Sequence, residues 1–248
     1  MSVEVTESAG IRHVTLRNDA KLNTVNTPIL EALAGAFAVG GEVRAVVLAG
    51  EGPRAFIGGA DIREMGAIAS PEQARAFITR IHQACAAICA CPVPVVARIQ
   101  GWCLGAGLEI AAACDLRLAS DRAQFGMPEV RVGIPSVVEA ALLPGLIGWG
   151  RTRRLLLLAE TLDAATAEAW GLVERVVAHD ALDQALDEWL HLLAEAGPRA
   201  IRHQKALISR WEGLGLDDAI QAGVDSFAAA FATEEPRRML GAFLARKR

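Results

Sequence analysis

The chain has 248 residues, a hydrophobic fraction of 52% and a formal net charge of −4. It is long and apolar enough to form one large domain or two modest ones around a sizeable core. Charged residues make up 22% and include no long basic run, which argues against a nucleic-acid partner. The first residues lack the features of a signal peptide, and no apolar stretch reaches about 18 residues, so we expect a cytoplasmic protein with no membrane partner.

The cysteines all lie in apolar or alanine-rich surroundings, at Cys85, Cys89, Cys91, Cys103 and Cys114. An odd number without a regular spacing is typical of reduced thiols rather than of a disulfide framework. His82, Cys85 and Cys89 share one face of a predicted helix, which leaves a metal site as an alternative. Because no second ligand pair follows, we favour small buried side chains at these positions and predict no metal.

Strands and helices alternate in the first half of the chain. Residues 3–8 and 11–17 predict a β-hairpin, residues 27–38 have helical spacing, and residues 43–50 predict a buried strand. The glycine-rich residues 51–65 predict a loop.

A long amphipathic helix is predicted next, over residues 71–91, with Ser70 as its N-cap and Pro71 in its first turn. The elements after it are a strand, a helix, a strand, and a short strand leading into a loop, over residues 93–101, 105–114, 116–120 and 123–130. This alternation predicts an α/β fold with largely parallel strands.

The pattern becomes helical after about Pro135, apart from a strand over residues 172–178. From about residue 193 the apolar side chains lie on more than one helix face, and they include Trp211, Phe227, Phe231 and Phe243. Such a tail is expected to pack against the body of the protein or against a neighbouring subunit.

Two glycine-rich turns stand before predicted helices, in "FIGGAD" and "CLGAGLE". The second resembles the start of a dinucleotide-binding fingerprint, but Ile110 occupies the position of its third glycine, which argues against that site. Turns of this kind leave backbone N–H groups free to bind an oxyanion or a phosphate. Together they could direct two donors at one developing negative charge.

Glu109 is the lone carboxylate in the apolar run "GWCLGAGLEIAAACD" before its final aspartate. A buried charge is unfavourable unless it is paired or neutralised, so this residue is a candidate for chemistry. Glu129 in "GMPEV" is either a solvated loop acid or the second member of an acid/base pair with Glu109.

Three stretches in this order resemble the enoyl-CoA hydratase/isomerase (crotonase) superfamily: "RAFIGGADIREM", "IQGWCLGAGLEIAAACDLRLAS" and "AQFGMPEVRVGIP". The resemblance covers nearly the whole chain. It implies a spiral of ββα units over residues 1–192 that carries the active site, and a helical region over residues 193–248 that packs in a homotrimer or a dimer of trimers.

The resemblance also implies an acyl-CoA thioester substrate, with CoA as part of the substrate and no separate cofactor. By motif position, the backbone N–H groups of Ala60 and Ala106 would hold the thioester oxygen. Glu109 would activate a water for attack at C3, and Glu129 would supply a proton to C2.

Residues implied in CoA binding fall in two segments, to which the tail of a neighbouring subunit could add one basic side chain. They are Ala20, Lys21 and Leu22 in the first segment, Gly58, Gly59, Asp61, Ile62 and Arg63 in the second, and Arg246 or Lys247 in the tail.

Two glutamates favour hydration of a trans-2-enoyl-CoA, or the reverse dehydration. An isomerase or another acyl-CoA lyase or hydrolase on the same scaffold is the alternative, and a non-catalytic or RNA-binding relative is a third. Glu139 departs from the usual small residues in the loop after Glu129. We expect it to favour the N-terminal end of the following helix, although an inward orientation would let it act on proton transfer or acyl selection.

Overall fold

The computed structural model describes residues 2–246, which form two β-sheets and surrounding helices. The six-stranded sheet has the order β1-β2-β3-β5-β7-β10, with strands Ser2–Ser8, Ile11–Arg17, Ala45–Gly50, Val95–Ile99, Leu116–Ser120 and Arg175–Val177. The four-stranded sheet has the order β4-β6-β8-β9, with strands Ala55–Ile57, Trp102–Leu104, Gln124–Gly126 and Thr161–Asp163. Strands β1 and β2 are antiparallel, as are β8 and β9, and all other pairs are parallel.

The helices α1 to α10 span Thr27–Ala36, Ile62–Gly66, Pro71–Ala90, Ala106–Ala113, Leu143–Leu158, Ala164–Trp170, Leu182–Glu195, Pro198–Trp211, Leu216–Ala230 and Glu235–Arg246. The 3-10 helices η1 to η4 span Asp19–Lys21, Glu129–Val132, Val138–Leu142 and His179–Ala181. The predicted N-cap of α3 is confirmed, because the Ser70 side chain accepts a hydrogen bond from the Gln73 N–H at 3.3 Å.

Consecutive strands alternate between the two sheets. The chain runs from β3 to β4 before α2, from β5 to β6 before α4, and from β7 to β8 before η2. This repeated unit of two strands and a helical turn confirms the predicted spiral of ββα units.

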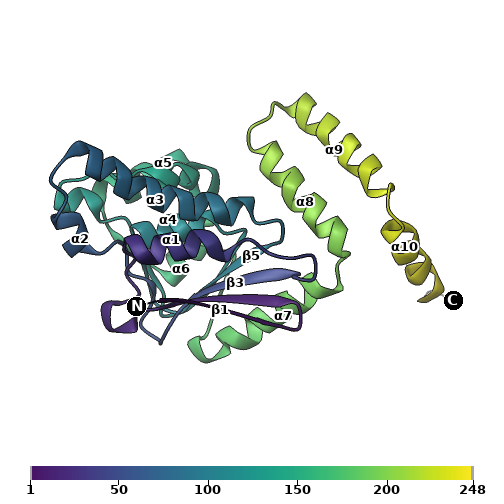
Figure 1. Ribbon diagram of the computed structural model, residues 1–248, viewed down its shortest axis with the longest axis horizontal. Helices are drawn as coiled ribbons and strands as arrows, with labels where there is room; N and C mark the ends of the chain where they lie inside the picture. Colours follow the sequence, from purple (N-terminus) through teal and green to yellow (C-terminus); the bar gives the residue numbers. More distant parts are fainter. Residues whose placement is uncertain (1, 247–248) are drawn as a thin grey trace.

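Helices cover both faces of the six-stranded sheet, which explains the continuous apolar run of β3. Val46 and Leu48 pack into the larger core with α1, α3 and α4. The alternate residues Ala45 and Val47 face α7 in a smaller cluster. Figure 1 shows α1 and α3 on one side of the strands and α7 on the other.

Several predictions of local structure were incomplete or wrong. Residues 51–65 are not a loop throughout, because they contain β4 and the start of α2. Strands β6 and β9 were missed. Each is three residues long and has too few alternating positions for a pattern, and each depends on pairing with β8.

The C-terminal helices α8, α9 and α10 extend to one side of the body (Figure 1). An ion pair between buried Lys205 and partly buried Asp115 attaches α8 to the core: the Lys205 Nζ lies 2.6 Å from Asp115 Oδ2 and also donates to the Val93 carbonyl at 3.0 Å. Asp115 accepts the Val95 N–H as well, at the start of β5. The division at residues 192 and 193 stays a prediction. No helix in the described chain is long and apolar enough to cross a membrane.

We expect Lys205→Ala to lower the free energy of unfolding by about 2–4 kcal/mol, because it leaves a partly buried Asp115 carboxylate without its cation. Urea denaturation at fixed protein concentration measures the change. Arg237→Ala is the matched control in the same tail. Its pair with Glu234 is exposed, so a change of less than about 0.5 kcal/mol is expected. Equal effects of the two substitutions would contradict the anchoring role of Lys205.

Candidate active site

The small sheet brings the three sequence motifs to one edge. Strands β4, β6 and β8 are adjacent and parallel, so their carboxyl ends meet. The turn at residues 58–60 follows β4, the turn that starts α4 follows β6, and Glu129 follows β8. This topology explains how motifs distant in the sequence form one site.

The two glycine turns touch each other. A Cβ built on Gly59, which has a φ of +109°, would lie 3.3 Å from the Leu104 carbonyl oxygen, so the backbones approach closely at this point. Ala106 is the first residue of α4, where N–H groups have no helical partner. Among the described residues, neither the Ala60 nor the Ala106 N–H donates to a backbone oxygen. Both donors are therefore available to a bound oxyanion.

Glu109 lies in the first turn of α4 and is only 4% exposed. Burial first, and then the negative charges of Glu129 and Glu139, raise the pKa of its carboxyl to about 8, against hydrogen bonds from the Ala140 and Val137 N–H groups. Its Oε1 atom has no hydrogen-bond partner among the described residues. A group of this kind holds a proton near neutral pH and can exchange it with a bound molecule.

Glu129 approaches the same turn from η2. A Cβ built on Gly105, which has a φ of +51°, would lie 2.3 Å from Glu129 Oε1 and would displace this carboxylate from its present position. Ser136 donates to Glu129 Oε2 at 2.8 Å and fixes its orientation. Glu129 is thus half-buried and packs on the turn that begins the helix of Glu109, while its role as the second member of an acid/base pair stays a prediction. Sequence reasoning missed Ser136, for which no local pattern exists.

The two segments with implied CoA contacts also lie side by side. The Gly58 N–H donates to the Leu22 carbonyl at 2.8 Å, and Lys21 Nζ lies 3.3 Å from Asp61 Oδ2. Asp61 caps α2 by accepting the N–H groups of Arg63 and Glu64. Burial opposes ionisation of Asp61, but these hydrogen bonds and the Lys21 ammonium together lower its pKa.

The remaining members of this group surround that contact. Gly59 is buried, Ala20, Ile62 and Arg63 are exposed, and Ile62 leaves 72% of its surface in solvent. In the tail, Arg246 is the last residue of α10, and Lys247 lies outside the described residues.

Glu139 departs from expectation. It lies in the first turn of η3, but its side chain is turned inward and is buried, and its Oε1 lies 2.7 Å from His82 Nδ1. The expectation of a role at the helix end alone is therefore wrong. His82 pairs with this carboxylate, and the described residues contain no group of three or more acidic, histidine or cysteine side chains placed to bind a metal ion.

Comparison with known proteins decides the family. Residues 6–248 match the family model described as enoyl-CoA hydratase/isomerase. The chain belongs to this family.

Individual members of the enoyl-CoA hydratase/isomerase family are similar to this protein over most of its length. It is 32% identical to the short-chain-enoyl-CoA hydratase of Clostridium acetobutylicum, over 95% of this chain and 91% of that protein. It is 33% identical to the crotonyl-CoA hydratase of Syntrophomonas wolfei, over 83% of this chain and 79% of that one. An enoyl-CoA hydratase structure from Mycobacterium smegmatis matches with a TM-score of 0.95 at 29% identity, covering 98% of this chain and 96% of that one.

The raised pKa of Glu109 predicts how the free energy of unfolding depends on pH. Its pKa of about 8 in the folded protein exceeds the ordinary 4.5, so the folded state keeps a proton that the unfolded chain releases between these values. The protein should therefore lose stability as the pH rises between these two pKa values. We expect Glu109→Gln to be more stable than the parent protein, by about 2–5 kcal/mol at pH 8.5 and by clearly less at pH 5.

Urea denaturation at the two pH values, at one protein concentration, measures this difference. A difference that does not change with pH would show that Glu109 ionises in its ordinary range.

Proposed function

We propose that the protein hydrates trans-2-enoyl-CoA thioesters to 3-hydroxyacyl-CoA, and catalyses the reverse dehydration. The observation that carries this proposal is the pair of carboxylates, Glu109 and Glu129, which approach one glycine turn beside two free N–H donors. Relatives with names that specify short-chain-enoyl-CoA and crotonyl-CoA hydratases add support.

The thioester oxygen binds the N–H groups of Ala60 and Ala106. Negative charge grows on this oxygen when water adds at C3, and donors placed in advance stabilise it without reorganisation. The free N–H of Ala106 at the start of α4 adds the positive end of the helix dipole. Removal of one such donor typically slows a reaction by about a hundredfold or more.

The two carboxylates share one proton during the reaction. In hydration, ionised Glu109 takes a proton from the attacking water and Glu129 gives one to C2; dehydration reverses both transfers. Hydration starts with the proton on Glu129, and dehydration starts with the proton on Glu109. The pair therefore carries one proton at the start of either direction. Because the pKa of Glu109 is about 8, this form persists through neutral pH and is lost in more alkaline solution.

The CoA moiety lies, in this proposal, along the contact between η1 and the turn after β4. Lys21 and Arg63 supply positive charge, the backbone at Gly58 and Gly59 supplies polar groups, and exposed Ile62 supplies an apolar surface. No cofactor beyond the substrate is needed for this chemistry, and a cytoplasmic location stays a prediction.

Purified protein with crotonyl-CoA should consume the enoyl thioester absorbance and yield a product heavier by one water. Glu109→Gln and Glu129→Gln should each reduce kcat by about 10²- to 10⁴-fold, because each removes a proton-transfer group. Glu195→Gln, at an exposed position near the end of α7, is the control and should retain activity. A product of unchanged mass would indicate an isomerase instead, and full activity in both site variants would overturn the mechanism.

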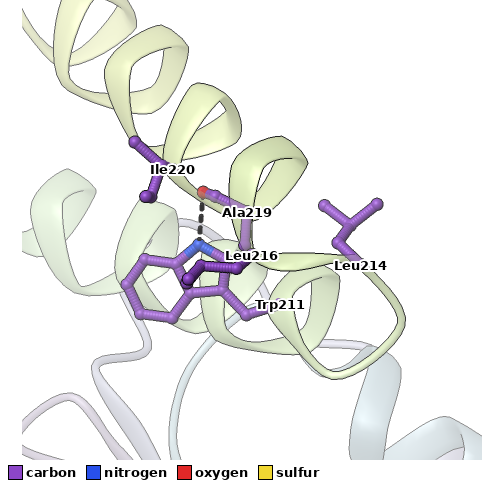
Figure 2. Close-up of a pocket in the computed structure, with 5 residues that line it drawn as sticks. All are labelled: Trp211, Leu214, Leu216, Ala219 and Ile220. Carbon is purple, nitrogen blue, oxygen red and sulfur yellow. Dashed lines mark hydrogen bonds between the residues drawn. The ribbon is translucent and has the colours of Figure 1, made fainter.

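We further propose that the tail packs in a homotrimer or a dimer of trimers. Helices α8 and α9 extend from the body and expose large apolar side chains, among them Trp211, Leu216, Ile220, Val224 and Phe227. Figure 2 shows the Trp211 indole N–H donating to the Ala219 carbonyl at the turn between α8 and α9. These residues line an apolar pocket of about 490 Å³. None of the proposed site residues lines this pocket, and such an exposed apolar surface is typical of an interface.

Light scattering should therefore give a mass of three or six chains. Leu216→Glu together with Phe227→Glu should shift the population toward monomer, because it places charges on the exposed face of α9. A stable monomer of the unaltered protein would overturn the proposed packing.

A further inference from the structure

The 3-10 helix η3 lies between the site and the outer helices. It packs against α3, α4 and α5, and it follows Ser136, which holds Glu129. Three carboxylates thus come from three different helical segments: Glu109 from α4, Glu129 from η2 and Glu139 from η3. The proposed reaction uses the first two and leaves the third without a role.

The pair formed by Glu139 and His82 links η3 to α3. Its two atoms, Glu139 Oε1 and His82 Nδ1, are 2.7 Å apart, and the side chains are 11% and 56% exposed, respectively. The other oxygen of Glu139, Oε2, is buried and has no partner among the described residues. A buried carboxylate with one free oxygen is unfavourable for stability, so its presence beside the site calls for a functional reason.

The backbone next to Glu139 is strained. Val138 has a φ of +37°, a conformation that β-branched residues rarely adopt. Such strain persists only where the surrounding structure enforces it, and it is frequent at functional sites. Here it lies between Val137 and Ala140, whose backbone N–H groups favour the ionised form of Glu109. The Ala140 N–H also donates to the Val137 carbonyl at 2.9 Å, which closes the first turn of η3.

We propose that His82 and Glu139 are a positioning pair that links η3 to α3 and so fixes the η3 backbone that packs against α4 and its Glu109 carboxylate. The pair touches neither water nor substrate in this scheme. It acts through the η3 backbone and through the charge of Glu139. The inference deepens the proposed hydration and rests on it for its kinetic readouts.

The titratable groups around this arrangement determine the sign of the charge effect. They are Glu129 from η2, Glu139 from η3, and His82 and Cys85 from α3. Burial and the charges of Glu139 and Glu109 raise the pKa of Cys85, so it remains a neutral thiol. The charge of Glu139 favours protonated Glu109, and its removal should make Glu109 release its proton more readily.

Glu139→Gln tests the charge of the pair. It keeps the size of the side chain and its capacity to hydrogen-bond to His82, so kcat at the optimum should fall by less than about tenfold. The alkaline midpoint of kcat/KM should move down by about half to one pH unit, because one of the charges that favour protonated Glu109 is gone. An unchanged midpoint would overturn the electrostatic part of the inference.

His82→Leu tests the position of η3. It removes the donor to Glu139 and should lower kcat by about tenfold or more with little change in KM, because the proposed CoA contacts are on η1 and α2. His82→Gln restores a donor and should recover most of this loss. His191→Leu is the matched control, since His191 forms the same type of pair with Glu195 on the exposed surface of α7. A His82→Leu variant with unchanged kcat would overturn the positioning role.

A measurement without substrate separates this inference from the proposed function. The difference in unfolding free energy between the parent protein and the Glu109→Gln variant, followed from about pH 5 to 9, reports the pKa of Glu109. That pKa should be lower when Glu139→Gln is present in both proteins. If the protein shows no hydratase activity but this shift occurs, the proposed reaction fails and the link to Glu139 stands; if activity is found without the shift, the link fails.

Discussion

The site depends on burial of the Glu109 carboxylate next to a second carboxylate. Burial and the charge of Glu129 both disfavour ionisation, whereas N–H groups from the η3 region favour it. The balance puts the pKa at about 8, close enough to neutral pH for the proton to be held and still transferable. A more exposed Glu109 would stay ionised, and one without its backbone donors would stay protonated.

The small sheet makes this proximity possible because its parallel strands place successive turns next to one another. The close contacts require particular glycines: Gly105 admits the Glu129 carboxylate, and Gly107 lies where a Cβ would be 2.1 Å from the Ile57 carbonyl oxygen. Gly105 therefore lets the Glu129 carboxylate approach the start of α4, and Gly107 lets α4 pack directly on β4. A side chain at Gly105 would displace Glu129, and one at Gly107 would move α4 and its Glu109 away from β4.

Local patterns predicted the long elements and the two glutamates. The buried run of β3, the N-cap at Ser70 and the carboxylate in an apolar helix start all follow from neighbouring residues. The partners of those groups do not. Ser136 lies seven residues from Glu129, and His82 lies 57 residues from Glu139, so both contacts depend on how separate elements pack. The inward turn of Glu139 also required a backbone conformation at Val138 that no propensity predicts.

The likeness to the family extends over nearly the whole chain, and the buried Glu139 on η3 bears on the proposed reaction. Hydration needs one proton distributed over two carboxylates, and an added negative charge nearby makes loss of that proton harder. Glu139 supplies such a charge from η3, whereas the proposed oxyanion donors are in the turn after β4 and at the start of α4. The third carboxylate is thus compatible with water addition. In the proposed hydration, its charge extends the pH range in which the pair holds its proton, while the proposed thioester contacts remain those of the two backbone turns.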